Sequence, residues 1–156
     1  MALLKIGNKA PAFTLEDQKE IKRSLSDYKG KIVVLYFYPK AMTPGCTIQA
    51  HGIRDSEKVF NKLGVKVLGV SIDSVTRLAR FEERDGLNFT LLSDEDHAIA
   101  DKYGVWGLKK FMGKEYMGIN RMTFIIDRDG KLNHIMEKVK SKTHNEDVIN
   151  YIKENC

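Results

Sequence analysis

The chain has 156 residues, a formal net charge of +5, and 42% hydrophobic and 30% charged side chains. These values are typical of one globular domain, over residues 1–156, that buries its own core without disulfides. The apolar runs are too short for a membrane span or a signal peptide and the basic residues are scattered singly, so we expect a cytoplasmic protein with neither a membrane nor a nucleic-acid partner.

Hydrophobic patterning predicts alternating strands and helices. Residues 32–38 (IVVLYFY) form a β-branched and aromatic run that is typical of a strand buried on both faces. Thr43 and Pro44 are residue types preferred at the N-cap and first position of a helix, which the pattern continues to about residue 63. Further along, the pattern predicts a strand at 65–72, a helix at 74–85, a strand at 89–92, a short helix opened by a capping box at 93–96, a Gly-rich loop at 104–120, two strands at 122–127 and 131–138 joined by a turn, and a last helix opened by a capping box at 143–146.

The order of these elements predicts the fold class. Strands that alternate with helices form a parallel sheet with crossover helices, and the closing hairpin adds antiparallel strands. We therefore expect an α/β protein with a mixed central sheet flanked by helices on both faces, which is the thioredoxin-like arrangement.

Cys46 is the candidate for chemistry. It is expected at the third position of the helix after the first core strand, where unpaired N–H groups and the helix dipole favour an anion such as a thiolate. Thr43 places a hydroxyl beside the same opening, and Gly45 lets another molecule approach the backbone. The alternative is a buried, inert cysteine at a helix start.

The residues around Cys46 resemble the active-site motif of peroxiredoxins, Pro39-x-x-x-Thr43-x-x-Cys46. The segment 36–47 (YFYPKAMTPGCT) is similar to the bacterioferritin-comigratory, or PrxQ-type, branch of that family. The similarity extends over nearly the whole chain and includes NFTLLSDEDH at 88–97, YGVWG at 103–107 and FMGKEYMGINRMTFIIDRDGK at 111–131. The resemblance implies a thiol peroxidase that reduces hydrogen peroxide and alkyl hydroperoxides without a cofactor.

The resemblance also implies roles for individual residues. Cys46 matches the peroxidatic cysteine, whose thiolate attacks the peroxide and becomes a sulfenic acid. Thr43 matches the threonine that hydrogen-bonds the peroxide and thiolate, and Pro39 a proline that shapes the pocket. Arg121 matches the arginine that stabilises the thiolate and the developing charge on the leaving oxygen; the sequence alone does not select it among 26 basic residues.

Two further groups are candidates for binding the peroxide or its partners. Gln49, one turn after Cys46, is interpreted either as a hydrogen-bond partner of Arg121 or as a solvent-facing helix residue. The backbone N–H groups of Gly45 and Cys46 are candidate donors to the peroxide.

The chain departs from the family pattern at the resolving cysteine. Many members of this branch carry it five residues after the peroxidatic one, where this chain has His51, which cannot form a disulfide and is expected to be a bystander. The only other thiol, Cys156, is either a resolving cysteine or a surface thiol. We expect a one-cysteine mechanism in which thioredoxin, glutaredoxin or glutathione attacks the sulfenic acid. The protein is expected to be a monomer, with a weak dimer as the alternative.

Two alternative functions stay open. A thiol–disulfide oxidoreductase usually carries Cys-x-x-Cys, but Thr43 and Gln49 occupy the positions three residues from Cys46. A peroxide-sensing or chaperone-like protein would use oxidation of Cys46 to control partner binding. No metal is expected, because the histidines are too far apart in sequence to form a ligand pattern.

Overall fold

The computed structural model describes residues 4–156; residues 1–3, where a signal peptide would begin, lie outside the described part. The elements in chain order are β1 (Thr14–Asp17), β2 (Lys22–Ser24), the 3-10 helix η1 (Leu25–Tyr28), β3 (Ile32–Phe37), α1 (Pro44–Asp55), α2 (Glu57–Lys62), β4 (Val65–Ser71), α3 (Val75–Asp85), β5 (Thr90–Ser93), α4 (Ala98–Lys102), β6 (Trp106–Phe111), β7 (Lys114–Ile119), β8 (Met122–Ile126), β9 (Leu132–Met136) and α5 (His144–Asn155). Within residues 4–156, no helix has the length and apolar character needed to cross a membrane.

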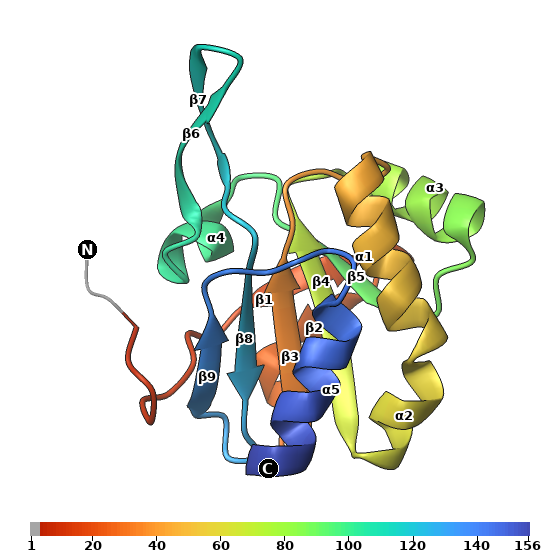
Figure 1. The fold of residues 1–156 in the computed structure, drawn as a ribbon, viewed down its shortest axis with the longest axis vertical. Coiled ribbons are helices and arrows are strands. Elements are labelled where there is room, and N and C mark those ends of the chain that lie inside the picture. Colours follow the sequence, from red (N-terminus) through yellow and green to blue (C-terminus); the bar gives the residue numbers. More distant parts are fainter. Residues whose placement is uncertain (1–3) are drawn as a thin grey trace.

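The core of the fold is a seven-stranded sheet in the order β2-β1-β5-β4-β3-β8-β9 (Figure 1). Its centre, β3, β4 and β5, is parallel, because helices connect these strands; β8 and β9 add antiparallel strands on one side. The mixed sheet expected from the sequence is therefore confirmed. The antiparallel strands β1 and β2 on the other side were not predicted.

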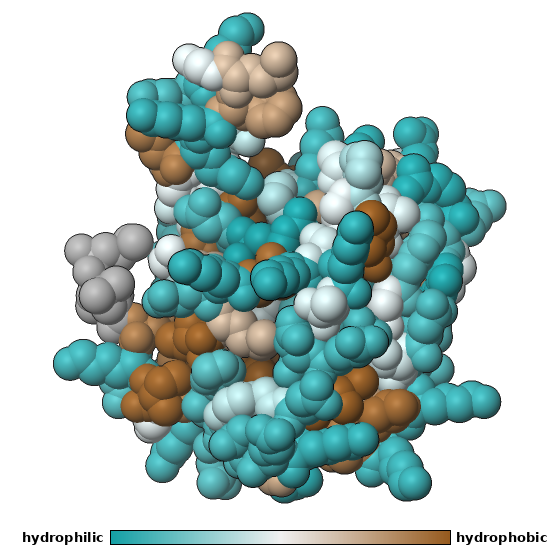
Figure 2. Space-filling view, viewed as in Figure 1, coloured by the Kyte–Doolittle hydropathy of each residue, from teal (hydrophilic) through white to brown (hydrophobic). Residues whose placement is uncertain are grey.

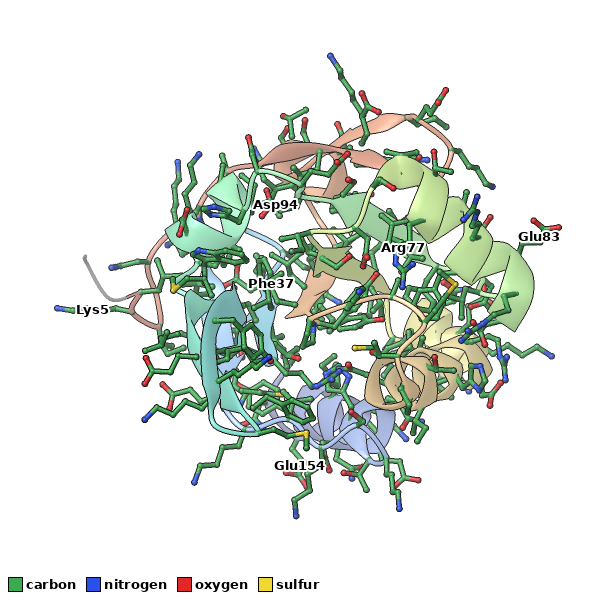
Figure 3. All side chains as sticks on the ribbon, turned by 90° about the horizontal axis from the view of Figure 1, so that it is seen from above. Lys5, Phe37, Arg77, Glu83, Asp94 and Glu154 are labelled. Atoms are coloured by element: carbon green, nitrogen blue, oxygen red, sulfur yellow. The ribbon has the colours of Figure 1, made fainter. Side chains whose placement is uncertain are left out.

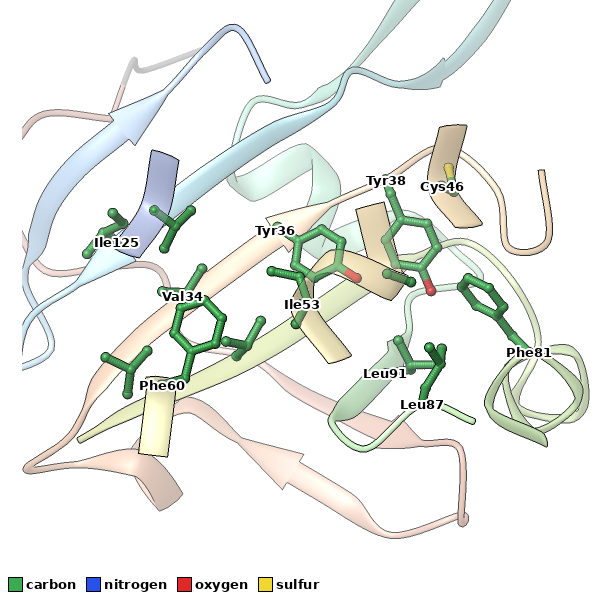
Figure 4. Packing of buried hydrophobic residues seen from close by; sticks show 14 of the residues in the cluster. Val34, Tyr36, Tyr38, Cys46, Ile53, Phe60, Phe81, Leu87, Leu91 and Ile125 are labelled. Atoms are coloured by element: carbon green, nitrogen blue, oxygen red, sulfur yellow. The ribbon is translucent and has the colours of Figure 1, made fainter. Parts of the chain in front are cut away.

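Strand β3 is buried on both faces, as its apolar run predicts. Successive side chains of a strand point to opposite faces. Val34 and Tyr36 pack with α1, α2, α3 and α5, whereas Leu35 and Phe37 pack with α4 and the N-terminal segment. Figure 4 shows Tyr36 and its neighbours filling the space between the sheet and the first group of helices. Packing on both faces fixes the carboxyl end of β3. The loop that leads to the candidate site follows directly after this end.

The helix expected over residues 43–63 is two helices, because the chain leaves helical geometry at Ser56 (φ −99°, ψ 6°). The Ser56 hydroxyl accepts a hydrogen bond from the Asn145 side chain of α5 at 2.9 Å. After the break, α2 directs Phe60 into the core, where it is 2% exposed.

The two expected capping boxes are wrong in detail. The short helix α4 begins at Ala98, and the Asp94 carboxylate accepts from the N–H groups of Ile99 (3.2 Å) and Ala100 (2.8 Å). Helix α5 does begin after Thr143, but the Thr143 hydroxyl donates to the Asp147 carboxylate at 2.9 Å. In α4 an aspartate therefore caps the helix from before the expected box, and in α5 the Thr143 hydroxyl bonds an aspartate side chain and does not cap the backbone.

The Gly-rich segment 104–120 was expected to be a loop and is the hairpin β6–β7, which stands away from the body of the molecule (Figure 1). Its two turn residues, Met112 (φ 51°) and Gly113 (φ 79°), both have positive φ, as a type I′ turn requires. The first of these positions usually carries Asn, Asp or Gly. Because this chain has methionine there, the usual sequence signal of the turn is absent. Figure 2 shows apolar and charged side chains mixed on this projection.

Candidate active site

Cys46 lies at the start of α1, just after the loop that follows β3. Thr43 occupies the N-cap position and Pro44 the first helical position, as predicted. The first hydrogen bond of the helix runs from the Thr47 N–H to the Thr43 carbonyl at 2.9 Å. The N–H groups of Gly45 and Cys46 precede this bond, at the positive end of the helix dipole. The thiol itself is only 2% exposed and borders the core (Figure 4).

The loop before α1 is held by two residues that follow β4. The buried Asp73 carboxylate accepts from the Ala41 N–H at 2.7 Å and from the Ser71 hydroxyl at 2.7 Å. Arg77 donates to the Ala41 carbonyl at 2.8 Å, from α3, where it faces this loop (Figure 3). Both backbone polar groups of Ala41 are thus fixed directly before Met42, which has a φ of 66°. Sequence reasoning did not identify this clamp.

Arg121 meets Cys46 although the two are 75 residues apart in sequence. It immediately precedes β8, which pairs with β3, so the sheet brings it to the start of α1. Its Nη2 lies 3.4 Å from the Cys46 Sγ, and its Nη1 donates to the Gln49 Oε1 at 2.5 Å. Gln49 is fully buried, so the alternative of a solvent-facing helix residue does not apply.

Two of the other sequence-predicted site residues, Thr43 and Gly45, lie beside Cys46 at the start of α1. The Thr43 hydroxyl donates its single hydrogen to the Lys40 carbonyl at 2.7 Å, which leaves its oxygen free to accept. A Cβ on Gly45 would lie 3.4 Å from the Arg121 Nη2, so a side chain there would crowd the guanidinium. Pro39 is half-buried at the start of the loop.

A buried hydrogen-bonded chain continues behind Arg121. The Gln49 Nε2 lies 3.0 Å from the His144 Nδ1, and the His144 Nε2 lies 2.8 Å from the Thr123 Oγ1. Burial and the nearby Arg121 lower the pKa of His144 from 6.5 to about 4, so its ring is neutral at neutral pH. Sequence reasoning noted His144 only as a histidine without a metal-ligand pattern.

The site is electropositive. Lys109 of β6 donates to the Ile119 carbonyl at 2.9 Å, and burial together with the nearby Arg121 guanidinium lowers the pKa of Lys109. Arg121 and Lys109 thus place two basic side chains near the Cys46 sulfur. Among residues 4–156, no group of three or more His, Cys, Asp or Glu side chains is placed to hold a metal ion.

The two candidate resolving positions lie apart from this arrangement. His51 is bonded to the Asp85 carboxylate at the end of α3, with 2.8 Å between His51 Nε2 and Asp85 Oδ1. Cys156 is exposed at the far end of α5, the helix that begins with His144 (Figure 1). At the helical rise per residue, these ends are roughly 18 Å apart. Desolvation also raises the pKa of the Cys156 thiol, which reduces its thiolate fraction.

Comparisons with known proteins agree with this geometry. Residues 6–135 match the AhpC/TSA family. The chain is 52% identical over 153 residues to peroxiredoxin Bcp of Escherichia coli K12, covering 98% of each chain, and 47% identical over 151 residues to peroxiredoxin Bcp of Bacillus subtilis, covering 97% of this chain and 96% of that protein.

Solved structures give the same result. The PrxQ of Xylella fastidiosa superposes with a TM-score of 0.92 at 30% identity, covering 99% of this chain and 98% of that one. The bacterioferritin comigratory protein of Xanthomonas campestris, described for its alkyl peroxide reduction activity, superposes with a TM-score of 0.89 at 32% identity, covering 96% of this chain and 98% of that one. The chain therefore belongs to the AhpC/TSA family, as a peroxiredoxin of the Bcp type.

Proposed function

We propose that Cys46 is the peroxidatic cysteine of this peroxiredoxin and that it reduces hydrogen peroxide and small organic hydroperoxides. The observation that supports this most directly is the Arg121 guanidinium, which reaches the Cys46 Sγ while it is anchored on Gln49. A fixed guanidinium stabilises a thiolate before the reaction and donates to the peroxide during it.

The reaction is a displacement at oxygen. The Cys46 thiolate forms a bond to the terminal peroxide oxygen while the O–O bond breaks, and the leaving oxygen takes up a proton to become water or an alcohol. Cys46 becomes a sulfenic acid and is thus oxidised by two electrons. Arg121 donates to the oxygen on which negative charge develops.

The remaining site groups orient the peroxide. The Thr43 oxygen, whose own hydrogen is given to Lys40, accepts from the peroxide O–H. The N–H groups of Gly45 and Cys46 add donors from the helix start. Pro39 forms part of the wall around this opening and limits the access of water to the sulfenic acid.

We further propose that resolution uses one cysteine of this chain and an external thiol. His51 at the usual resolving position carries no sulfur, and Cys156 lies at the opposite end of α5 from the site. A thiol of thioredoxin, glutaredoxin or glutathione attacks the Cys46 sulfenic acid, releases water and forms a mixed disulfide. A second thiol then releases Cys46 as a thiol.

Intact mass after one equivalent of hydrogen peroxide tests both proposals, with a sulfenic-acid trap and in the Cys46→Ser and Cys156→Ser variants. A trapped adduct that requires Cys46 and survives Cys156→Ser is the expected result. A loss of two hydrogens or a disulfide-linked dimer that disappears in Cys156→Ser would make Cys156 the resolving thiol. Absence of any reaction at Cys46 would refute the peroxidatic role. Turnover with thioredoxin against glutaredoxin plus glutathione then identifies the reductant.

A further inference from the structure

A chain of three fully buried side chains leads away from Arg121: Gln49 of α1, which accepts from the guanidinium, then His144 of α5 and Thr123 of β8. Their hydrogen bonds form one continuous line from the Cys46 sulfur to the sheet, with successive distances of 3.4, 2.5, 3.0 and 2.8 Å. The guanidinium is thus connected through hydrogen bonds to residues of three separate elements.

The chemistry of these groups determines where each hydrogen lies. Arginine can only donate, so the Gln49 oxygen faces Arg121 and the Gln49 amide N–H faces His144. The Nδ1 of His144 must then accept, and the neutral ring carries its hydrogen on Nε2, which donates to the Thr123 hydroxyl. The opposite orientation of the Gln49 amide would set its N–H groups against the Arg121 donor and its oxygen against the accepting Nδ1 of His144.

The groups around His144 keep it in this state. Arg121 and burial disfavour a charged ring and lower the pKa of His144, whereas Asp147 on the same helix opposes them less strongly. Tyr36 of β3 packs edge-on against the ring at 5.3 Å between centroids. The ring is thus a neutral acceptor at Nδ1, enclosed by an aromatic side chain and its two hydrogen-bond partners.

We propose that His144 is a positioning residue for catalysis: by accepting from Gln49 it fixes the amide orientation that anchors Arg121 beside Cys46. The inference rests on the proposed function, because it assigns His144 a role through the arginine that acts on the peroxide. Without the acceptor at Nδ1, Arg121 alone orients the Gln49 amide, and the anchor of the guanidinium is less firmly fixed.

A double-mutant cycle tests this with the rate constant for Cys46 and hydrogen peroxide as the readout. His144→Phe keeps a ring in place but removes the acceptor, and we expect the rate to fall about tenfold, the effect of one lost hydrogen bond. His144→Asn retains an acceptor near Nδ1 and should restore most of the rate. In a Gln49→Ala background, His144→Phe should cause no further loss.

A second histidine provides a matched control. His134 of β9 stacks on Tyr151 of α5, away from Arg121, and His134→Phe should leave the rate unchanged. Equal losses in His144→Phe and His144→Asn, or an undiminished effect of His144→Phe in the Gln49→Ala background, would overturn the inference and leave His144 a packing residue. Circular dichroism of every variant confirms that it is folded.

A second readout does not depend on peroxide chemistry. The guanidinium hydrogens of Arg121, assigned by their absence in Arg121→Lys, should exchange with water about tenfold faster in His144→Phe than in the native chain. Long-range nitrogen–proton spectra should show hydrogen on Nε2 of His144, and in Gln49→Glu also on Nδ1, because a carboxylate only accepts. Unchanged exchange and a native Nδ1–H tautomer would each refute the inference. If the exchange and tautomer results are as expected but the native chain shows no reaction at Cys46, the proposed function alone is refuted.

Discussion

Replacing His144 with asparagine should flatten the dependence of stability on pH between about pH 6.5 and pH 4. The His144 ring is fully buried and both of its nitrogens are hydrogen-bonded. Burial and the Arg121 guanidinium lower its pKa from 6.5 to about 4. A folded protein that resists protonating a histidine is destabilised by acid, since the unfolded chain takes up that proton freely.

The sign and size follow from these two values. Between pH 6.5 and pH 4 the unfolded state binds more protons at His144 than the folded state, so the free energy of unfolding falls as the pH falls. The effect is absent above the unfolded value and complete below the folded one. A difference of 2.5 pH units corresponds to about 3 kcal/mol, a large fraction of the stability of a small domain.

Urea unfolding of the native chain and His144→Asn across this pH range measures the effect, with the fluorescence of Trp106 and circular dichroism as probes. Other groups also titrate: burial raises the pKa of Asp94, and at Asp17 and Asp85 hydrogen bonds outweigh burial and lower the pKa. These carboxylates are present in both proteins, so the difference between the two curves isolates His144. Parallel curves at all pH values would refute the reasoning that His144 is buried in its neutral form.

Three further substitutions test the site and its support. Arg121→Met should slow the reaction of Cys46 with hydrogen peroxide by about 10- to 100-fold in stopped-flow measurements, because one charge-assisted hydrogen bond is lost; a rate within twofold of the native value would contradict the assigned role. Asp73→Ala leaves a buried backbone N–H without its acceptor and should lower the free energy of unfolding by about 2 kcal/mol in urea, and an unchanged midpoint would argue against the clamp on the loop. Gly69→Ala places a Cβ 3.0 Å from the Tyr36 ring and should cost about 1–3 kcal/mol by overpacking, measured in the same way; a neutral result would mean that the ring moves aside.

The central strands and the larger helices could be predicted because their signals are local. The apolar run of β3 and the capped start of α3 each lie within one short window of sequence. Strands β1 and β2 carry no such signal, because they are short and expose polar side chains at the side of the sheet. At the break between α1 and α2, Ser56 accepts a hydrogen bond from Asn145, a residue 89 positions away, and no local pattern indicates this contact.

The same distinction applies to the site. Thr43, Gly45 and Cys46 form a contiguous motif, so their placement at a helix start follows from residue types alone. Arg121 has no local signal; it required the family resemblance, since only the pairing of β8 with β3 brings it to the sulfur.

His144 shows why even a resemblance over the whole chain leaves part of a site unidentified. It lies 95 residues from Gln49 and contacts it only because α5 packs along α1 on the same face of the sheet. A motif indicates which side chains take part in the chemistry. Their orientation depends on buried neutral side chains that bond to them, such as Gln49 and His144, and these have no charge or spacing pattern in the sequence. A buried glutamine that must be turned one way needs an acceptor at a particular place. In this chain that acceptor is a histidine whose other functions, metal binding and acid–base chemistry, are prevented by the burial that makes it suitable for this one.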